Sequence, residues 1–231
     1  MPIFYTQDNL LIFLLGFLII TSKNVQIPVY YIEGGSIMSK ILNLIKKSNG
    51  IITTSTIIKA GFSRGNLTYL VNTGKIERVS RGVYTLPDIW EDELFNIQNK
   101  YKRGIFSLNT ALFLCDLTDR TPMAYQMTFP STYNLTNPKK DNILCSGAKE
   151  PFYSMGLVEL TTPSGNKVKS YNIEKTLCDI LRPKNHIDIQ IITNAFKKYI
   201  NKTEKNIPLL SKYAKELKVS KQLRAYLEVL L

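Results

Sequence analysis

The sequence predicts an α+β fold, with an N-terminal winged helix-turn-helix domain followed by a mixed α/β domain that ends in a helical, basic tail. Three observations carry this prediction. Two short helical patterns are joined by a glycine-containing turn between residues 53 and 74. An alternating apolar and polar pattern follows at residues 75–87. Beyond residue 104, strand-like segments separated by turn residues alternate with helical stretches.

The charge of the chain favours a polyanionic partner. Its 231 residues carry a formal net charge of +12, which is typical of proteins that bind nucleic acid or an anionic membrane surface. An AT-rich genome explains much of the lysine excess equally well. The arginines are more informative, because three of the seven, Arg64, Arg78 and Arg81, fall within one short stretch.

Cysteine and histidine usage excludes several classes of site. The chain has three widely spaced cysteines, Cys115, Cys145 and Cys178, and no CxxC pair, so we interpret them as reduced thiols in a cytoplasmic protein. His186 is the only histidine, which excludes a histidine-rich metal site and a two-histidine acid/base mechanism within one chain. We therefore expect no metal and no cofactor.

Residues 1–37 are interpreted as a leader whose start is mis-assigned. The apolar run Leu10 to Ile20 is about half the length of a membrane-spanning helix, and no lysine or arginine precedes it as in an export signal. The codons for Glu33-Gly34-Gly35 can spell a purine-rich ribosome-binding sequence just before Met38. We expect translation to begin at Met38, and no membrane partner.

Two helices are predicted in the stretch from Ser39 to Gly61. A helical face of isoleucine and leucine starts at Ser39 and ends at Asn49-Gly50. After a short extended link, Thr53 or Thr54 can cap a second helix, because the hydroxyl accepts the free N–H groups of the first turn. Gly61 is predicted to end that helix.

The third predicted helix runs from Arg64 to Thr73, with Ser63 as its cap and Gly74 as its stop. In a helix-turn-helix, the second helix of the pair enters the major groove of DNA, and its early residues reach base edges. Arginine pairs with guanine there and asparagine with adenine. The outward-facing residues are predicted to be Arg64, Asn66, Thr68 and Tyr69.

The alternating segment from Lys75 to Pro87 is predicted to form a two-stranded wing around the turn at Ser80-Arg81-Gly82. Arg78 and Arg81 would lie at or near its tip, where guanidinium groups grip phosphates or enter the minor groove. The alternative is a small helical domain with a solvated basic hairpin. The residues predicted to bind DNA are Ser63, Arg64, Asn66, Thr68, Tyr69, Lys75, Arg78, Ser80 and Arg81.

The second half is predicted to begin after an acidic helical connector at residues 89–104. A strand or turn enters a helix at residues 105–114, and Tyr125 to Phe129, Ile143-Leu144 and Val158 to Thr161 resemble strands. Residues 171–181 form a helical pattern, and helices continue from Ile187 into a strongly basic tail. That tail either adds non-specific DNA affinity or is a solvated face.

Two acidic residues raise the question of catalysis. Glu174 and Asp179 lie on the predicted helix at residues 171–181, and paired carboxylates can hold a divalent metal. A capped, solvated helix explains both acids, and we interpret Cys178 as a small buried side chain. No catalytic residue is predicted.

The stretch GFSRGNLTYLVNTGKIERVSRGVYTLP, residues 61–87, resembles the N-terminal domain of the AbiEi antitoxins of type IV toxin–antitoxin systems. The segments at residues 107–112 and 174–179 are similar to motifs of that family's second domain. The resemblance implies a DNA-binding domain at residues 38–88 and an antitoxin domain at residues 105–231.

The same resemblance implies a function. It implies an antitoxin that represses its own operon, binds inverted repeats in double-stranded operator DNA with two copies per operator, and counters a nucleotidyltransferase toxin without requiring a stable complex. It implies that the protein is not an enzyme. Two alternatives stay open: a metal-dependent nuclease that uses Glu174 and Asp179, and a winged-helix regulator with a small-molecule sensor domain.

Overall fold

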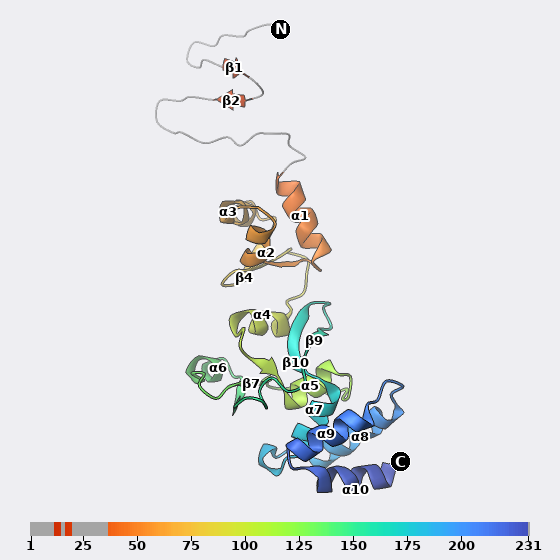
Figure 1. The fold of residues 1–231 in the computed structure, drawn as a ribbon. Coiled ribbons are helices and arrows are strands. Elements are labelled where there is room, and N and C mark those ends of the chain that lie inside the picture. The colour runs from red at the N-terminus through yellow and green to blue at the C-terminus, as the bar shows by residue number, and fades with distance from the viewer. Residues whose placement is uncertain (1–11, 15–16, 20–36, 231) are drawn as a thin grey trace. The chain divides into compact units, whose positions relative to one another are not determined.

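The computed structural model describes residues 12–14, 17–19 and 37–230. The chain divides into two units, residues 1–89 and residues 90–231 (Figure 1). The described residues have an α+β fold, as the sequence predicts. Among their helices, none is long and apolar enough to cross a membrane.

Only part of the predicted leader is described. Strand β1 (Ile12–Leu14) pairs antiparallel with β2 (Phe17–Ile19), a pairing within the apolar run that sequence reasoning did not predict. The other leader residues before Ile37 lie outside the described part of the chain. Translation from Met38 stays a prediction.

The first unit combines three helices with a three-stranded sheet. Its elements are α1 (Ile37–Lys47), β3 (Ile51–Thr53), α2 (Thr54–Lys59), α3 (Arg64–Asn72), β4 (Glu77–Ser80) and β5 (Val83–Thr85). The strand order is β3-β5-β4, and both pairings are antiparallel. The sheet therefore joins the strand before α2 to the hairpin after α3.

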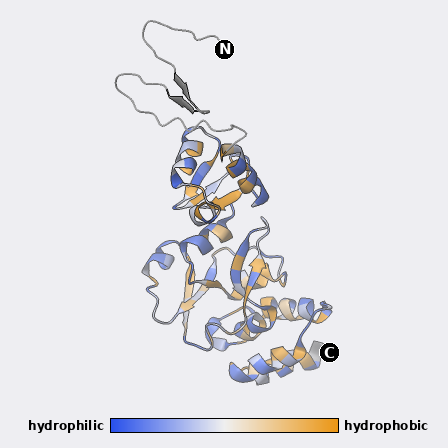
Figure 2. Cartoon of the chain, turned by 45° about the horizontal axis from the view of Figure 1, so that its top comes forward, coloured by the Kyte–Doolittle hydropathy of each residue, from blue (hydrophilic) through white to orange (hydrophobic). Residues whose placement is uncertain are grey.

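An apolar cluster holds the three helices of this unit together. Its fully buried side chains include Ile41 and Ile45 of α1, Ile57 of α2, and Leu67 and Leu70 of α3. Burying a side chain of this size stabilises a fold by roughly 1.5–3 kcal/mol relative to exposure. Figure 2 shows hydrophobic and hydrophilic residues interleaved along these helices, as the predicted amphipathic patterns require.

The helix boundaries follow local chemistry with one exception. Asn49 and Gly50 have φ values of 55° and 77° and end α1, as predicted. The Thr53 hydroxyl accepts the backbone N–H of Thr56 at 3.2 Å and caps α2. Ser63 occupies the cap position of α3, but its side chain makes no capping hydrogen bond. The prediction that the Ser63 hydroxyl caps α3 is wrong, because this exposed side chain accepts no backbone N–H of the first turn.

The second unit is built on a five-stranded mixed sheet with order β8-β7-β6-β10-β9. The pairs β7–β8 and β6–β10 are parallel, and β6–β7 and β9–β10 are antiparallel. Its elements are α4 (Glu93–Lys100), β6 (Ile105–Phe106), α5 (Leu108–Leu114), β7 (Gln126–Pro130), α6 (Thr136–Lys140), β8 (Leu144–Ala148), β9 (Leu157–Thr161), β10 (Lys167–Tyr171), α7 (Ile173–Ile180), a 3-10 turn (Pro183–Asn185), α8 (Ile189–Asn201), α9 (Ile207–Glu216) and α10 (Ser220–Leu230).

Helix α7 lies at the centre of this unit. It contacts α5, α8 and α9, and the last two group with α10 at one end of the unit (Figure 1). Seven of its eight residues are buried, so side chains from several elements surround it on all sides. The sequence does not predict strand β10 or helix α6, because Ser170 interrupts the apolar alternation of β10 and α6 is only five residues long.

Helix α4 belongs to the core of the second unit. Leu94 and Tyr101 are buried in the cluster that contains Phe106 and Phe129. The Asp92 carboxylate caps α4 through the backbone N–H of Phe95 at 3.0 Å, and it also accepts hydrogen bonds from Thr162 and Asn166. Much of the segment expected to be a connector, residues 89–104, therefore packs against the sheet of this unit.

Candidate nucleic-acid interface

Helix α3 presents one polar face to solvent and one apolar face to the core. Leu67 and Leu70 are buried, whereas Arg64 and Thr68 are exposed one turn apart. Tyr69 is a large aromatic side chain that keeps 54% of its surface exposed. An exposed tyrosine ring with its polar hydroxyl is available to contact a partner.

The predicted site residues on α3 do not all face outward equally. Asn66 is half-buried, and its backbone N–H bonds to the Ser63 carbonyl at 3.3 Å. The helix ends with Thr73, whose hydroxyl donates to the Tyr69 carbonyl at 2.9 Å. Gly74, with φ +66°, then turns the chain, and the exposed Lys75 leads into β4.

The hairpin of β4 and β5 carries the remaining predicted residues. Its two strands are joined by the residues Arg81 and Gly82, and a bulge between Arg78 and Ser80 shifts their register. Arg81 is exposed in the turn, and Ser80 is half-buried. The Arg78 Nε donates to the Ser80 carbonyl at 3.4 Å, which leaves its terminal nitrogens available.

The start of α2 fixes the hairpin turn, a contact that the sequence did not predict. The backbone N–H of Thr54 donates to the Gly82 carbonyl at 2.8 Å, and the Thr54 hydroxyl donates to the same oxygen at 3.4 Å. Gly82 has φ +81°, which favours glycine. The turn that carries Arg81 is therefore held against α2. Sequence spacing carries no signal for this contact, because 28 residues separate its partners.

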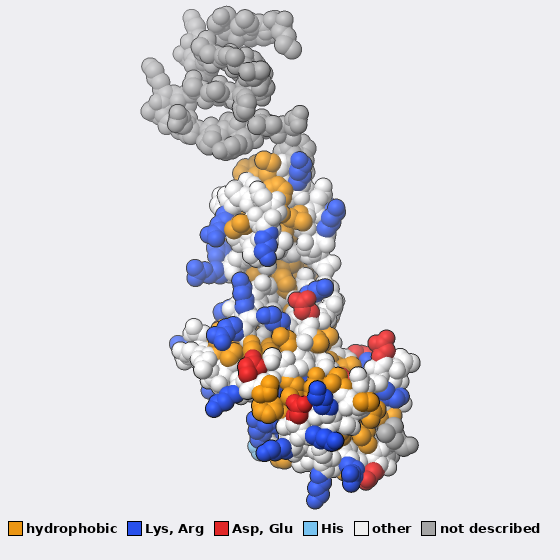
Figure 3. Space-filling model, in the orientation of Figure 1, with side chains coloured by type: hydrophobic (Ala, Val, Ile, Leu, Met, Phe, Trp, Pro, Cys, Tyr) orange, Lys and Arg blue, Asp and Glu red, His pale blue; other side chains and the backbone are white. Residues whose placement is uncertain are grey.

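The charge of the first unit is uncompensated. Residues 37–89 contain eight lysines and arginines but only Glu77 and Asp88 as acids. No lysine or arginine within residues 37–89 forms a salt bridge with a described residue. Lysine and arginine side chains are spread over the face that Figure 3 shows, with fewer acids among them. Such a surface attracts polyanions.

The first unit thus combines three helices and a three-stranded sheet with an excess of exposed basic side chains. Residues 39–87 match the family described as "Transcriptional regulator, AbiEi antitoxin". This match confirms the resemblance found in the sequence. It covers about a fifth of the chain and ends before the second unit, so the AbiEi resemblance of residues 107–112 and 174–179 stays a prediction.

No curated protein matches the chain. A crystal structure of the RV2827C protein from Mycobacterium tuberculosis is similar over 82% of this chain and 80% of that chain, with a TM-score of 0.42 and 12% sequence identity.

Outside the AbiEi match, Glu174 and Asp179 are not solvated, contrary to the sequence interpretation. Both are nearly fully buried. The Asp179 carboxylate pairs with the Lys175 ammonium at 2.5 Å, and the Glu174 carboxylate accepts the Tyr199 hydroxyl at 3.2 Å. The two acids therefore have different partners. Among the described residues, no cluster of three or more histidine, cysteine or acidic side chains could hold a metal ion.

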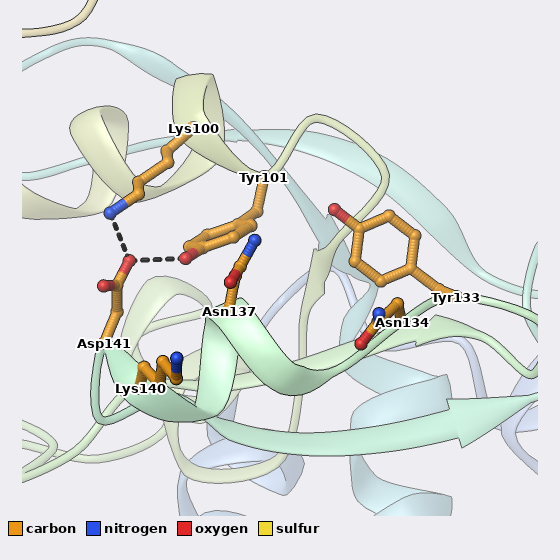
Figure 4. Close-up of a pocket in the computed structure, with 7 residues that line it drawn as sticks. All are labelled: Lys100, Tyr101, Tyr133, Asn134, Asn137, Lys140 and Asp141. Atoms are coloured by element: carbon orange, nitrogen blue, oxygen red, sulfur yellow. Dashed lines mark hydrogen bonds and ion pairs between the residues drawn. The ribbon is translucent and has the colours of Figure 1, made fainter.

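The second unit contains an open pocket of about 560 Å³ between α4 and α6 (Figure 4). The Lys100 ammonium lies 2.5 Å from the Asp141 carboxylate, and the Tyr101 hydroxyl donates to the same carboxylate. These hydrogen bonds hold the pKa of Asp141 below its usual value. Burial and the adjacent carboxylate raise the pKa of Tyr101. The strongest polar groups of this pocket thus satisfy one another.

Cys178 is buried among apolar side chains, as expected. Its burial raises the pKa of the thiol to about 12, so almost none is thiolate at neutral pH. Burial likewise raises the pKa of Cys115 to about 12. The three cysteines are free thiols.

Proposed function

We propose that this protein is an antitoxin and transcriptional autorepressor of a type IV toxin–antitoxin operon, and that residues 38–88 form a winged helix-turn-helix domain. In this proposal α2 and α3 are the helix pair, and the β4–β5 hairpin is the wing. The proposal contains no catalytic step. Residues 89–104 then connect to an antitoxin domain at residues 105–231.

The polar face of α3 carries the proposal. It combines an arginine at the first turn, a second polar residue one turn later and an exposed tyrosine, in a unit with unpaired positive charge. Arginine at this position suits guanine in the major groove, and the half-buried Asn66 suits a neighbouring adenine. The other proposed contacts, chiefly to phosphates, are Ser63, Thr68, Tyr69, Lys75, Arg78, Ser80 and Arg81.

The AbiEi match supports the regulatory and antitoxin parts of the proposal through the family's description. The family resemblance adds a nucleotidyltransferase toxin, which the protein counters without needing a stable complex, and inverted operator repeats bound by two copies. A DNA-binding regulator acts in the cytoplasm, where we place the protein.

The first experiment is a fluorescence-anisotropy titration of labelled DNA from upstream of the gene. Arg64→Ala is expected to weaken specific binding by about 1–3 kcal/mol and to relax sequence preference, since it removes a base contact. This free energy corresponds to roughly 5- to 150-fold in Kd. Arg81→Ala is expected to weaken binding to all sequences alike and to flatten the salt dependence, since it removes a phosphate contact.

Arg224→Ala is the matched control. It removes one exposed arginine from α10 in the other unit and is expected to leave specificity unchanged. Specific binding that is unaffected by Arg64→Ala would refute the role of α3. An absence of specific binding by the wild-type chain would refute the repressor proposal.

A growth assay tests the antitoxin part separately. The neighbouring toxin gene is expressed with wild-type chain or with Arg64→Ala, both from a foreign promoter. Rescue of growth by both forms is expected, because residues 105–231 are proposed to act on the toxin independently of DNA. Failure of the wild-type chain to rescue growth would refute the antitoxin role while leaving DNA binding intact.

A further inference from the structure

The second unit contains a small polar cavity that the DNA-binding proposal does not use. It lies where β7 and β8 meet the start of α5, helix α7 and the turn that follows α7. Its volume is about 40 Å³, and since one water needs about 10–15 Å³ by the same kind of measure, it has room for about three or four oxygen-sized groups. This is the size of a phosphoryl group.

The charge of the cavity is positive. Lys175, Arg182 and Lys184 line it, and Asp179 is the one carboxylate among its described lining residues. Asp179 lies 2.5 Å from the Lys175 ammonium and 3.6 Å from an Arg182 terminal nitrogen. The lining therefore carries three basic side chains and one acidic side chain. Desolvation, together with the nearby charge of Arg182, lowers the pKa of Lys184, as expected where positive charge is crowded.

Hydroxyl groups also line the cavity, beside apolar residues such as Leu108 and Phe152. Ser107 is 2% exposed, and its Oγ has no hydrogen-bond partner among the described residues. Thr128 and Ser146 also line the cavity, and their hydroxyls share one hydrogen bond of 2.8 Å, so one of them keeps a proton to donate. A buried hydroxyl without a partner costs stability, and a ligand that accepts its proton removes that cost.

We propose that this cavity binds the phosphoryl group of inorganic phosphate or of a phosphate monoester, held by Arg182, Lys184 and the Ser107 hydroxyl. Charge-assisted hydrogen bonds from guanidinium and ammonium groups suit a phosphate oxygen, and Arg182 can contact two oxygens at once. Lys175 stays paired with Asp179 in the lining of the cavity. The cavity is too small for a nucleoside, so the remainder of a monoester would lie outside it.

The test is isothermal titration calorimetry on the full chain with inorganic phosphate, at constant ionic strength in chloride. We expect one phosphate per chain, and at least tenfold weaker binding for Arg182→Gln/Lys184→Gln. Lys212→Gln/Lys221→Gln removes the same charge from exposed positions on α9 and α10 and is expected to change the affinity less than twofold. Lys175 is left intact, because its removal would leave the buried Asp179 carboxylate without its ammonium partner and destabilise the unit.

Ser107→Ala separates binding from folding. Because the Ser107 Oγ has no partner, the melting temperature is expected to be unchanged or higher, while phosphate binds several-fold more weakly. Titrations with adenosine monophosphate and adenosine distinguish the two ligand sources. Tighter binding of the monophosphate indicates a monoester, and binding of phosphate alone indicates the free ion. No phosphate binding at millimolar concentration, or equal affinities in the two double variants, would overturn the proposal.

Discussion

Replacing Asp92 by alanine tests how the second unit holds its first helix. The carboxylate is 3% exposed and accepts three hydrogen bonds, at 3.0 Å from the Phe95 backbone, 2.6 Å from the Thr162 hydroxyl and 2.9 Å from the Asn166 amide. Thr162 and Asn166 lie in the turn between β9 and β10, about 70 residues away along the chain. One side chain thus caps α4 and fixes a distant turn.

The expected loss follows from these three bonds. Removal of a helix cap costs about 1 kcal/mol. Leaving the buried donors of Thr162 and Asn166 unpaired costs about 1–3 kcal/mol each, and the relief of a buried charge offsets part of this. Asp92→Ala is therefore expected to lower the free energy of unfolding of the second unit by about 3–5 kcal/mol.

Urea denaturation followed by far-UV circular dichroism measures this loss, and hydrogen exchange of α4 assigns it to the second unit. Glu91→Ala is the matched control, because this neighbouring carboxylate is exposed and accepts one hydrogen bond, from Asn96 at 2.8 Å. It is expected to cost less than about 1 kcal/mol. An equally small loss for Asp92→Ala would refute the role given to this network.

Three further predictions concern packing, the turn and the thiols. Leu70→Ala, at a fully buried position, is expected to lower the free energy of unfolding of the first unit by about 2–5 kcal/mol. Hydrogen exchange measures this loss, and a loss smaller than about 1 kcal/mol would contradict the prediction. Gly82→Ala forces an alanine to adopt φ +81° in the turn that carries Arg81 and is expected to weaken DNA binding several-fold. Gly74→Ala, which carries comparable backbone strain at φ +66° outside that turn, is the control, and equal DNA affinities of the two variants would count against a fixed turn. The half-buried Cys145 is expected to react with a thiol reagent at pH 8 before Cys178, because burial raises the pKa of Cys178 to about 12. Mass spectrometry measures the order in which the two thiols are modified, and earlier modification of Cys178 would contradict the burial argument.

Local signals explain what could be predicted from the sequence. The Thr53 cap, the stop at Asn49-Gly50 and the hairpin around Arg81 each depend on residues close together in the chain, so their patterns are visible without a structure. Ser63 shows the limit of this reasoning. A serine at a cap position can bond to the first turn of its helix or point to solvent, and sequence does not distinguish the two.

The error at α7 has a different cause. Helical periodicity assigns one face to the core and the other to solvent, so Glu174 and Asp179 were interpreted as solvated. In the structure α5, α8 and α9 surround this helix, and both acids are buried with partners. No pattern within eight residues reveals how many neighbours a helix has.

The sequence by itself determined the order and boundaries of the helices in the first unit, its excess of positive charge and its likeness to AbiEi regulators at residues 39–87. The tertiary structure alone decided that Thr54 holds the turn of Arg81, that Asp92 joins α4 to a distant turn, and that Ser107 and Arg182 line one cavity. The physical reason is range. Caps, turns and periodicity arise from bonds between near neighbours, whereas the burial and pairing of polar groups depend on segments that only the folded chain brings together.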